Sequence, residues 1–241
     1  MRFLTILAMA AVPLVGICQT ETRELVGQIG SRPALLVLHA SKTAEGAWQL
    51  AGEYVVLSTL QRRFLEGEAS PEIGVTTLRE GTTPILFGRP STGELRGTWR
   101  AGNFRGARFA PGGQERERFE FTEEFPAMES YSANIRCDAA GARYSSTLNL
   151  AVDAGKLQSL DWRSKVVPSG HSCSLTNLQQ QAWKGGLRFA AGRCSVTLRE
   201  VGDYVRVVAE SCVEQCGSQA YLEPLVIDRR GNCRLLYTEP R

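Results

Sequence analysis

The chain is poor in histidine and nearly balanced in charge, and both features exclude classes of function. Its 241 residues include only two histidines, which leaves little room for a histidine-rich metal site or for histidine-based catalytic triads. The net charge of +3, from 28 basic and 25 acidic residues, is too small to argue for nucleic acid or an anionic membrane as a partner. With 43% apolar and 22% charged residues, the chain has enough apolar surface to fold, so disorder is excluded.

Motifs that carry common catalytic chemistries are also missing. The chain has no Gly-x-Ser-x-Gly nucleophile elbow, no His-Glu-x-x-His zinc helix and no Gly-x-x-x-x-Gly-Lys phosphate loop. Nothing distinguishes its close carboxylate pairs from a solvated face. These pairs are Glu66/Glu68, Glu115/Glu117 and Glu123/Glu124. We therefore expect no cofactor, no metal site and no catalytic residue, and a binding protein is favoured over a hydrolase whose carboxylates meet only in the fold.

Long apolar runs are confined to the N-terminus. Arg2 precedes an apolar run over residues 3–17, and a polar Gln-Thr-Glu-Thr segment follows Cys18. This pattern is typical of an export signal at residues 1–18, and it predicts a periplasmic or secreted protein with no transmembrane segment after cleavage. The bulky Ile17 before Cys18 disfavours a lipoprotein site, although lipidation of Cys18 and a retained membrane anchor stay open.

Cysteine is absent from residues 19–136, and six cysteines follow in the second half. They are Cys137, Cys173, Cys194, Cys212, Cys216 and Cys233. An even number in an exported chain predicts a disulfide framework. A zinc site on Cys212 and Cys216 is the competing interpretation, but it lacks a second close pair of ligands.

The cysteine distribution divides the mature chain near residue 127, next to a polar segment that contains Pro126. We expect a cysteine-free antiparallel β domain at residues 19–127 and a cysteine-containing antiparallel β domain at residues 128–241. The predicted fold class is all-β, with two antiparallel barrel or sandwich domains, the second held by disulfides.

Alternation of apolar and polar residues predicts the strands. Within residues 34–40, Leu36 and Leu38 point one way and His39 the other, and a buried, hydrogen-bonded structural histidine is expected. The even spacing of Phe119, Phe121 and Phe125 favours a strand over a helix in residues 114–125. Glycine-rich residues 102–106 and 111–113 are expected to form loops. The other strands expected in the first half are 48–57, 61–66, 74–79, 84–88 and 95–100.

The second half repeats this pattern. Residues 194–200 and 204–210 are expected to form a hairpin around residues 201–203. If the turn centres on Asp203, Cys194 lies opposite Cys212 and the two can bond, which leaves Cys216 for Cys233 or Cys137. His171 is expected in a solvated loop. The expected strands are 133–137, 145–152, 157–163, 172–178, 187–190, 193–200, 204–210, 221–227 and 232–237.

A basic stretch with interleaved aromatics covers residues 96–108 and contains Trp99. It could bind an anionic polymer by charge and stacking. A strand that places Trp99 in the core is favoured, since the net charge gives the binding interpretation no support.

Two short motifs in residues 130–200 resemble those of the c-type lysozyme inhibitors of the bacterial envelope. Residues 140–144 read Ala-Gly-Ala-Arg-Tyr against a Ser-Gly-x-x-Tyr loop, and residues 183–185 read Trp-Lys-Gly against a Trp-x-Lys-Gly-like segment. The resemblance implies a flattened antiparallel barrel that inserts a hydroxyl and a lysine ammonium between the catalytic carboxylates of lysozyme. The chain departs from the pattern at Ala140, which has no hydroxyl, and in the distance of about 40 positions between the motifs.

The sequence thus predicts an exported, non-enzymatic binding or inhibitor-like protein directed at a protein or glycan of the cell envelope. The resemblance implies lysozyme as the partner, with Lys184, Arg143 and Tyr144 as contact residues. An envelope hydrolase and a structural envelope module without a soluble ligand are the alternatives. The sequence leaves the oligomeric state open.

Overall fold

The computed structural model describes residues 20–42, 48–69, 74–84, 90–218 and 221–237, which form β-strands and one short helical turn. The predicted all-β class is confirmed. The expected signal peptide at residues 1–18 and most of the strand expected at 84–88 lie outside the described residues. Within those residues, no helix is long and apolar enough to cross a membrane.

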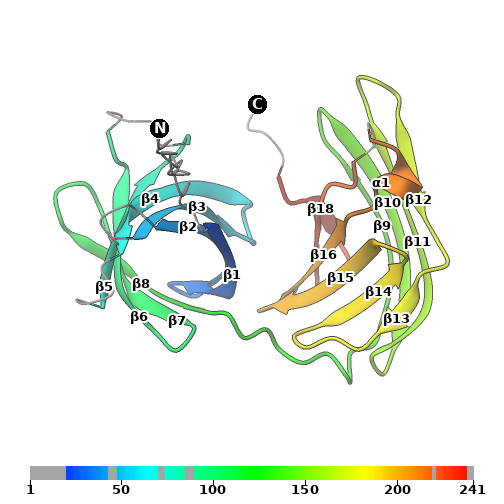
Figure 1. The fold of residues 1–241 in the computed structure, drawn as a ribbon, viewed down its shortest axis with the longest axis horizontal. Coiled ribbons are helices and arrows are strands. Elements are labelled where there is room, and N and C mark those ends of the chain that lie inside the picture. The colour runs from blue at the N-terminus through cyan, green and yellow to red at the C-terminus, as the bar shows by residue number, and fades with distance from the viewer. Residues whose placement is uncertain (1–19, 43–47, 70–73, 85–89, 219–220, 238–241) are drawn as a thin grey trace, which may run out of the picture.

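The first eight strands form a closed antiparallel barrel, on the left of Figure 1. Each strand pairs with the next one along the chain, and residues 26–29 of β1 pair with residues 119–122 of β8 to close the ring. The strands are β1 (Thr20–Ile29), β2 (Arg32–Lys42), β3 (Trp48–Val56), β4 (Gln61–Ala69), β5 (Val75–Gly81), β6 (Gly93–Arg100), β7 (Asn103–Phe109) and β8 (Glu115–Thr122).

Alternation along each strand decides which side chains fill the barrel. On β2, Leu36 and Leu38 are buried in the barrel core, whereas His39 is exposed. The expectation of a buried His39 is therefore wrong, because its position in the alternation faces outward. The expected hydrogen bond is present, since a ring nitrogen of His39 lies 2.9 Å from the Thr22 hydroxyl of the neighbouring strand.

Residues 103–106, expected as part of a loop, lie in strand β7. Gly106 pairs directly with Gly97 of β6, and a Cβ on Gly106 would lie 2.0 Å from the carbonyl oxygen of Arg96. Glycine is therefore required here because the backbones of β6 and β7 lie very close together, and the expected loop at residues 103–106 is wrong. The expected loop at residues 111–113 is confirmed as a turn.

The C-terminal half contains a four-stranded sheet in the order β12-β11-β10-β9 and a six-stranded sheet in sequential order from β13 to β18 (Figure 1). One cluster of buried side chains, which includes Trp162 and Phe189, forms the core of both. The elements are β9 (Ala133–Ala140), β10 (Tyr144–Asp153), β11 (Lys156–Val166), β12 (Ser172–Leu175), β13 (Gln179–Gln181), β14 (Leu187–Ala191), β15 (Cys194–Val201), β16 (Tyr204–Glu210), α1 (Val213–Cys216), β17 (Leu225–Asp228) and β18 (Cys233–Leu235).

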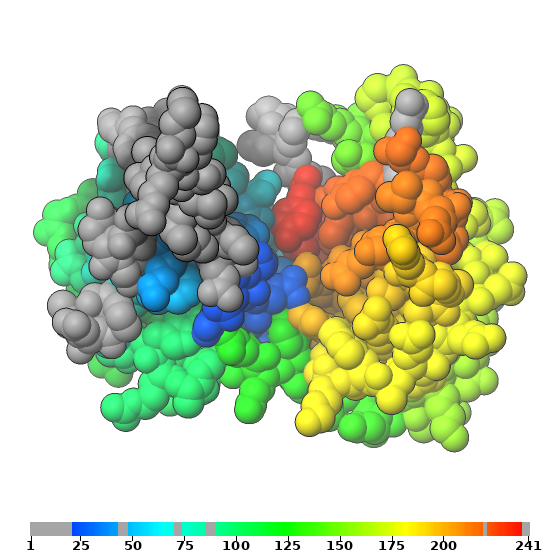
Figure 2. All heavy atoms as spheres, in the orientation of Figure 1, coloured from blue at the N-terminus to red at the C-terminus, as the bar shows by residue number. Residues whose placement is uncertain are grey.

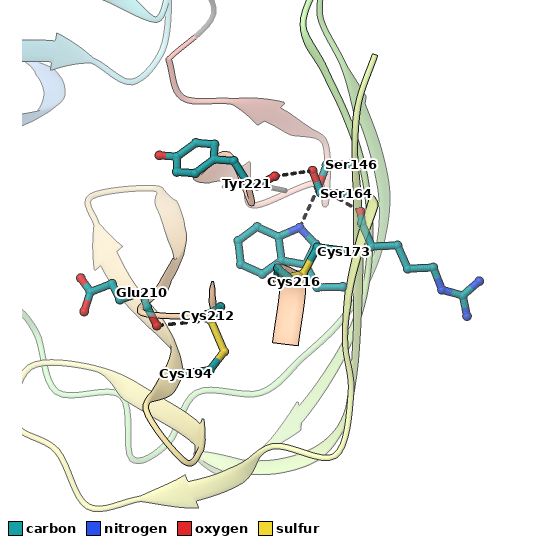
Figure 3. Close-up of a disulfide and its surroundings, with 10 residues drawn as sticks. Ser146, Ser164, Cys173, Cys194, Glu210, Cys212, Cys216 and Tyr221 are labelled. Carbon is teal, nitrogen blue, oxygen red and sulfur yellow. Dashed lines mark hydrogen bonds between the residues drawn. A yellow bond between two sulfur atoms is a disulfide. The ribbon is translucent and has the colours of Figure 1, made fainter. Parts of the chain in front are cut away.

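All six described cysteines form disulfides, two of which are drawn in Figure 3. The predicted Cys194–Cys212 pair is confirmed, with a Cα–Cα distance of 4.2 Å. The expected partner of Cys216 was wrong: α1 contacts β12, so Cys216 bonds Cys173, and Cys137 bonds Cys233. Three disulfides are consistent with an oxidising compartment.

The barrel and the C-terminal sheets meet through a small apolar cluster and an ion-pair cluster. The buried members of the apolar cluster are Val26, Leu35, Val55, Leu57, Val201, Val226 and Leu236. Beside them, Glu24 of β1 accepts hydrogen bonds from Arg199 and Arg206. In Figure 2 the blue atoms of the first strands abut the orange and yellow atoms of the C-terminal sheets.

Candidate ligand-binding pocket

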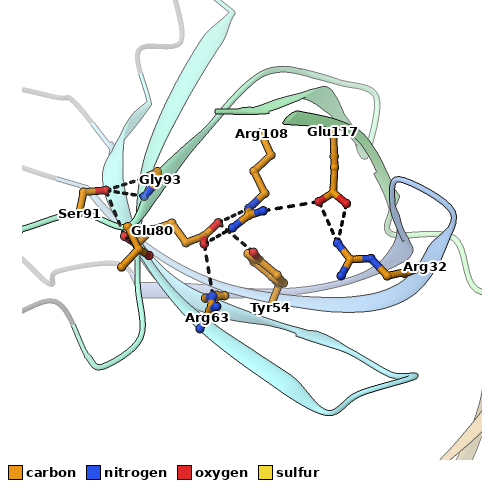
Figure 4. Close-up of polar contacts among 9 residues, drawn as sticks. Arg32, Tyr54, Arg63, Glu80, Ser91, Gly93, Arg108 and Glu117 are labelled. Atoms are coloured by element: carbon orange, nitrogen blue, oxygen red, sulfur yellow. Dashed lines mark hydrogen bonds and ion pairs between the residues drawn. The ribbon is translucent and has the colours of Figure 1, made fainter. Parts of the chain in front are cut away.

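One end of the barrel is filled by a network of charged side chains around Glu80, which is 0% exposed (Figure 4). Arg108 donates two hydrogen bonds of 2.7 Å to this carboxylate, and Tyr54 donates a third at 2.8 Å. Arg63 completes the set with an ion pair at 3.3 Å. Alternation places these side chains inside, at the end of the barrel where β4 begins and β5 finishes.

The network continues outward from Arg108 to Glu117, at 3.5 Å, and from Glu117 to Arg32 through two hydrogen bonds. We call these six residues the floor network: Arg32, Tyr54, Arg63, Glu80, Arg108 and Glu117. Burial acts to raise the pKa of Glu80, but the hydrogen bonds from Arg108 and Tyr54 outweigh it, so this pKa lies below its usual value. The carboxylate is thus ionised and engaged by its neighbours, which suits a structural role rather than proton transfer.

The opposite end of the barrel contains a pocket of about 280 Å³, which we call the mouth pocket. It is lined by Glu21, Arg23, Leu38, Ala40, Trp48, Leu50, Ala69, Gly74, Thr76 and Trp99. Trp48 begins β3 and Trp99 lies near the end of β6, so the two half-buried indoles flank the barrel interior from separate strands. Beneath them, Leu38 and Leu50 form an apolar base.

A compensated cation lies at the rim of the mouth pocket. The guanidinium of Arg23 stacks 5.1 Å from the centre of the Trp99 ring. It donates hydrogen bonds to Glu21 at 3.2 Å and to Glu123 at 3.0 Å. Partial burial acts to lower the pKa of Arg23, but the two carboxylates outweigh it and raise this pKa. Arg23, Glu21 and Glu123 thus give the described part of the rim one positive and two negative charges.

Thr76 is the buried polar residue of the mouth pocket. It is 3% exposed and lies on β5, two positions before Leu78 of the barrel core. Among the described residues, no hydrogen bond is formed by its hydroxyl group, although the side chain lines the pocket. The described buried side-chain polar atoms without a partner do not include this hydroxyl, so its oxygen is open to the pocket and can bind a polar atom of a ligand.

A larger hollow, of about 860 Å³, lies on the outer face of the barrel over β2 to β5. Glu53 in its wall is already paired with Arg62, and the Arg62 guanidinium also covers the Phe64 ring at 4.7 Å. The mouth pocket lies within the barrel between two tryptophans, whereas this hollow lies on the outer face among charged side chains, so the mouth pocket is the better candidate for a ligand.

The contact residues implied by the resemblance lie in two separate places. Arg143 and Tyr144 lie where β10 begins, and the Tyr144 ring packs 5.7 Å from that of Tyr221. Lys184 is exposed in the turn between β13 and β14. The side chain of Gln180 on β13 accepts a hydrogen bond from the backbone of Leu157 and donates one to the backbone of Gly155, so β13 lies beside the turn that follows the other end of β10. The structure therefore brings Arg143 and Tyr144 together and places Lys184 apart from them.

The other residues considered for chemistry are also dispersed. His171 is exposed in a loop, as expected. Glu66 and Glu68 lie on β4, whereas Glu117 belongs to the floor network and Glu123 to the mouth rim. In the part of the chain that the structure describes, no group of three His, Cys, Asp or Glu side chains could hold a metal ion. The stretch 96–108 is the β6–β7 hairpin, with Trp99 packed against the barrel core as favoured.

Comparisons of the chain with protein-family models, with curated proteins and with solved structures found no match.

Proposed function

We propose that this protein is an exported, non-enzymatic binding protein that holds a small, mainly apolar ligand in the mouth pocket of its barrel. The observation that carries the proposal is the contrast between the two ends of the barrel. One end is filled by the floor network, whose charges are paired, and the other is an apolar pocket between Trp48 and Trp99. A small barrel with one filled and one hollow end can hold a single small ligand.

The proposed location rests on two features of the chain. The N-terminal apolar run has the pattern of an export signal, and the three disulfides fit a periplasmic or secreted protein. We also propose that the barrel and the C-terminal sheets are two domains divided near residue 127, since the connecting residues 123–132 form neither helix nor strand.

We further propose that the C-terminal sheets bind a protein or glycan of the cell envelope. Arg143 and Tyr144 share one end of these sheets beside Tyr221, which is 48% exposed. If lysozyme is the partner, as the resemblance implies, Arg143 and Tyr144 form one contact and Lys184 a separate one.

The small-ligand proposal is tested with the uncharged dye N-phenyl-1-naphthylamine, which becomes fluorescent in apolar pockets. We expect saturable binding by the mature protein. Ala69→Phe adds a ring at the wall of the mouth pocket and should weaken binding about tenfold or more, because the ring occupies the ligand's space. Tyr221→Ser, in the C-terminal sheets, is the matched control and should bind like the wild type.

Circular dichroism and the unfolding midpoint of each variant show whether the barrel is intact. Two results would refute the proposal: no saturable dye binding by the wild type, or equal binding by a folded Ala69→Phe variant.

A further inference from the structure

We propose that the ligand of the mouth pocket is an uncharged, planar aromatic compound with one hydrogen-bonding substituent that reaches Thr76. This inference rests on the function proposed above and deepens it, because it states the chemistry that the pocket selects. Three properties of the pocket lead to it: its aromatic walls, its compensated rim and the hydroxyl of the buried residue Thr76.

The walls favour a flat ring. Trp48 and Trp99 each pack partly against the barrel core and keep part of their surface in the pocket. Aromatic rings that stack or meet edge to face gain about 0.5–1.5 kcal/mol beyond the burial of their area. The cavity of about 280 Å³ is close to the lower end of ligand pockets, about 300–1,000 Å³, so it suits one or two fused rings.

The rim disfavours an anion. Of the described residues that line the pocket, Arg23 is the cation, and Glu21 and Glu123 already accept its hydrogen bonds. The carboxylate of an anionic ligand would be repelled by Glu21 and Glu123 and attracted by Arg23 alone, in a site partly screened from water, so its binding would be weakened. Arg23 also rests against Trp99, which fixes the guanidinium as part of the wall.

The Thr76 hydroxyl selects a polar substituent. Thr76 is 3% exposed and lines the pocket, and its hydroxyl forms no hydrogen bond with the described residues and is open to the pocket. A ligand that offers a donor or an acceptor at this depth satisfies the hydroxyl, whereas a plain hydrocarbon leaves it without a partner. Because the nearby residues Leu38 and Leu50 are apolar, one such group on the ligand is sufficient.

The test uses three matched probes with the same ring system: naphthalene, 2-naphthol and 2-naphthoate. Their dissociation constants are measured at neutral pH by displacement of N-phenyl-1-naphthylamine. We expect 2-naphthol to bind about 2- to 10-fold more tightly than naphthalene, which is the usual net value of one hydrogen bond. We expect 2-naphthoate to bind roughly tenfold or more weakly than 2-naphthol, because of the rim carboxylates.

Two sets of variants assign these differences to residues. Thr76→Val keeps the shape of the side chain and should abolish the preference for 2-naphthol over naphthalene while naphthalene still binds. Thr77→Val is the matched control, since Thr77 is the next residue of β5 and is exposed on the outer face. Combining Glu21→Gln with Glu123→Gln should improve 2-naphthoate binding by about tenfold, whereas Glu120→Gln, at an exposed pair with Arg105, should not.

The outcomes separate this inference from the proposed function. If 2-naphthoate binds best, or if Thr76→Val leaves the preference for 2-naphthol unchanged, the proposed ligand chemistry is wrong and the binding function survives. If none of the three probes displaces the dye from the wild type, the inference is overturned. If the dye itself does not bind, the proposed function fails as well.

Discussion

The barrel and the C-terminal sheets are both antiparallel, but different means hold them together. The barrel closes by strand pairing and has no cysteine in its described residues. The C-terminal sheets are open, and two of their three disulfides lie at the edges: Cys137–Cys233 joins edge strands β9 and β18, and Cys173–Cys216 joins edge strand β12 to α1. The comparison teaches that a sheet closed on itself has little free edge to secure, whereas open edges need a further constraint.

Among the described residues, each region also contains one buried glutamate, held in a different way. Glu80 in the barrel is held by Arg63, Arg108 and Tyr54, and its pKa is lowered. Glu223 near the C-terminus is 4% exposed and accepts a backbone hydrogen bond from Tyr237 at 3.0 Å. Burial raises the pKa of Glu223 to about 7, despite that hydrogen bond and the charge of Arg62. The barrel therefore keeps its buried acid ionised, and the C-terminal half favours a neutral one.

The largest expected effect comes from opening an edge disulfide. The double variant Cys137→Ala with Cys233→Ala removes a disulfide between residues 96 positions apart. By the chain-entropy relation, its loss should lower the free energy of unfolding by about 4–5 kcal/mol. The pair Cys194→Ala and Cys212→Ala, at a separation of 18, should cost about 3 kcal/mol. Urea unfolding of both variants measures the difference, and an equal or reversed order would contradict it. Dye binding at the barrel mouth should persist in both.

The next effect is expected in the floor network. Glu80→Gln leaves Arg63 and Arg108 without their shared counter-charge inside the barrel, and should cost about 3–5 kcal/mol. Glu94→Gln, which removes an exposed pair with Arg96, should cost less than about 1 kcal/mol. Chemical denaturation of the two variants at pH 7 is the measurement. Similar costs would show that the floor network does not hold the barrel together.

A smaller effect depends on pH. The folded state raises the pKa of Glu223 to about 7, above the 4.5 of an ordinary glutamate, so it binds the proton more tightly than the unfolded chain. The resulting stabilisation is fully present below pH 4.5 and is lost as the pH rises to about 7. Glu223→Gln should therefore gain about 1–3 kcal/mol relative to the wild type between pH 4.5 and pH 8.

Urea unfolding of the wild type and of Glu223→Gln at several pH values measures this gain. Glu80, with its lowered pKa, has the opposite sign: its stabilisation is present above the ordinary pKa of a carboxyl group and is lost as the pH falls below it. A constant difference between wild type and Glu223→Gln across pH would refute the assignment.

The smallest expected effect concerns the Tyr144–Tyr221 ring pair. Tyr221→Leu keeps an apolar side chain but removes the ring contact, and should cost about 1 kcal/mol. The free energy of unfolding measures this cost, and Tyr204→Leu, at a half-buried tyrosine outside the pair, is the control. A cost above that of Glu80→Gln would show that the ring pair stabilises the fold more than the floor network does.

Local patterns predicted most strands, because alternation and turn residues act over a few positions. The β15–β16 hairpin is an example: Gly202, with a φ of 60°, occupies the first central position of its two-residue turn, as a type II′ turn requires. Strand β1 was missed because charged residues occur on both of its faces. Arg23 faces the mouth and Glu24 faces the C-terminal arginines, so no clean alternation is visible.

The candidate site was hidden from the sequence for a different reason. Trp48, Thr76 and Trp99 come from three strands, and only closure of the barrel brings them to one end. The sequence did not predict the buried position of Glu80 either, because a single glutamate in a strand is usually exposed to solvent. Trp99 was correctly expected in a core, yet its role in lining a pocket depends on contacts far apart in the chain.

The first and last strands of the barrel are joined over only part of their length. Residues 26–29 of β1 pair with residues 119–122 of β8, whereas residues 20–25 of β1 pair with β2 alone. Residues 115–118 of β8 lie outside this ladder and pair with β7. The β1–β8 seam can therefore separate with the loss of fewer backbone hydrogen bonds than the longer pairings of the barrel.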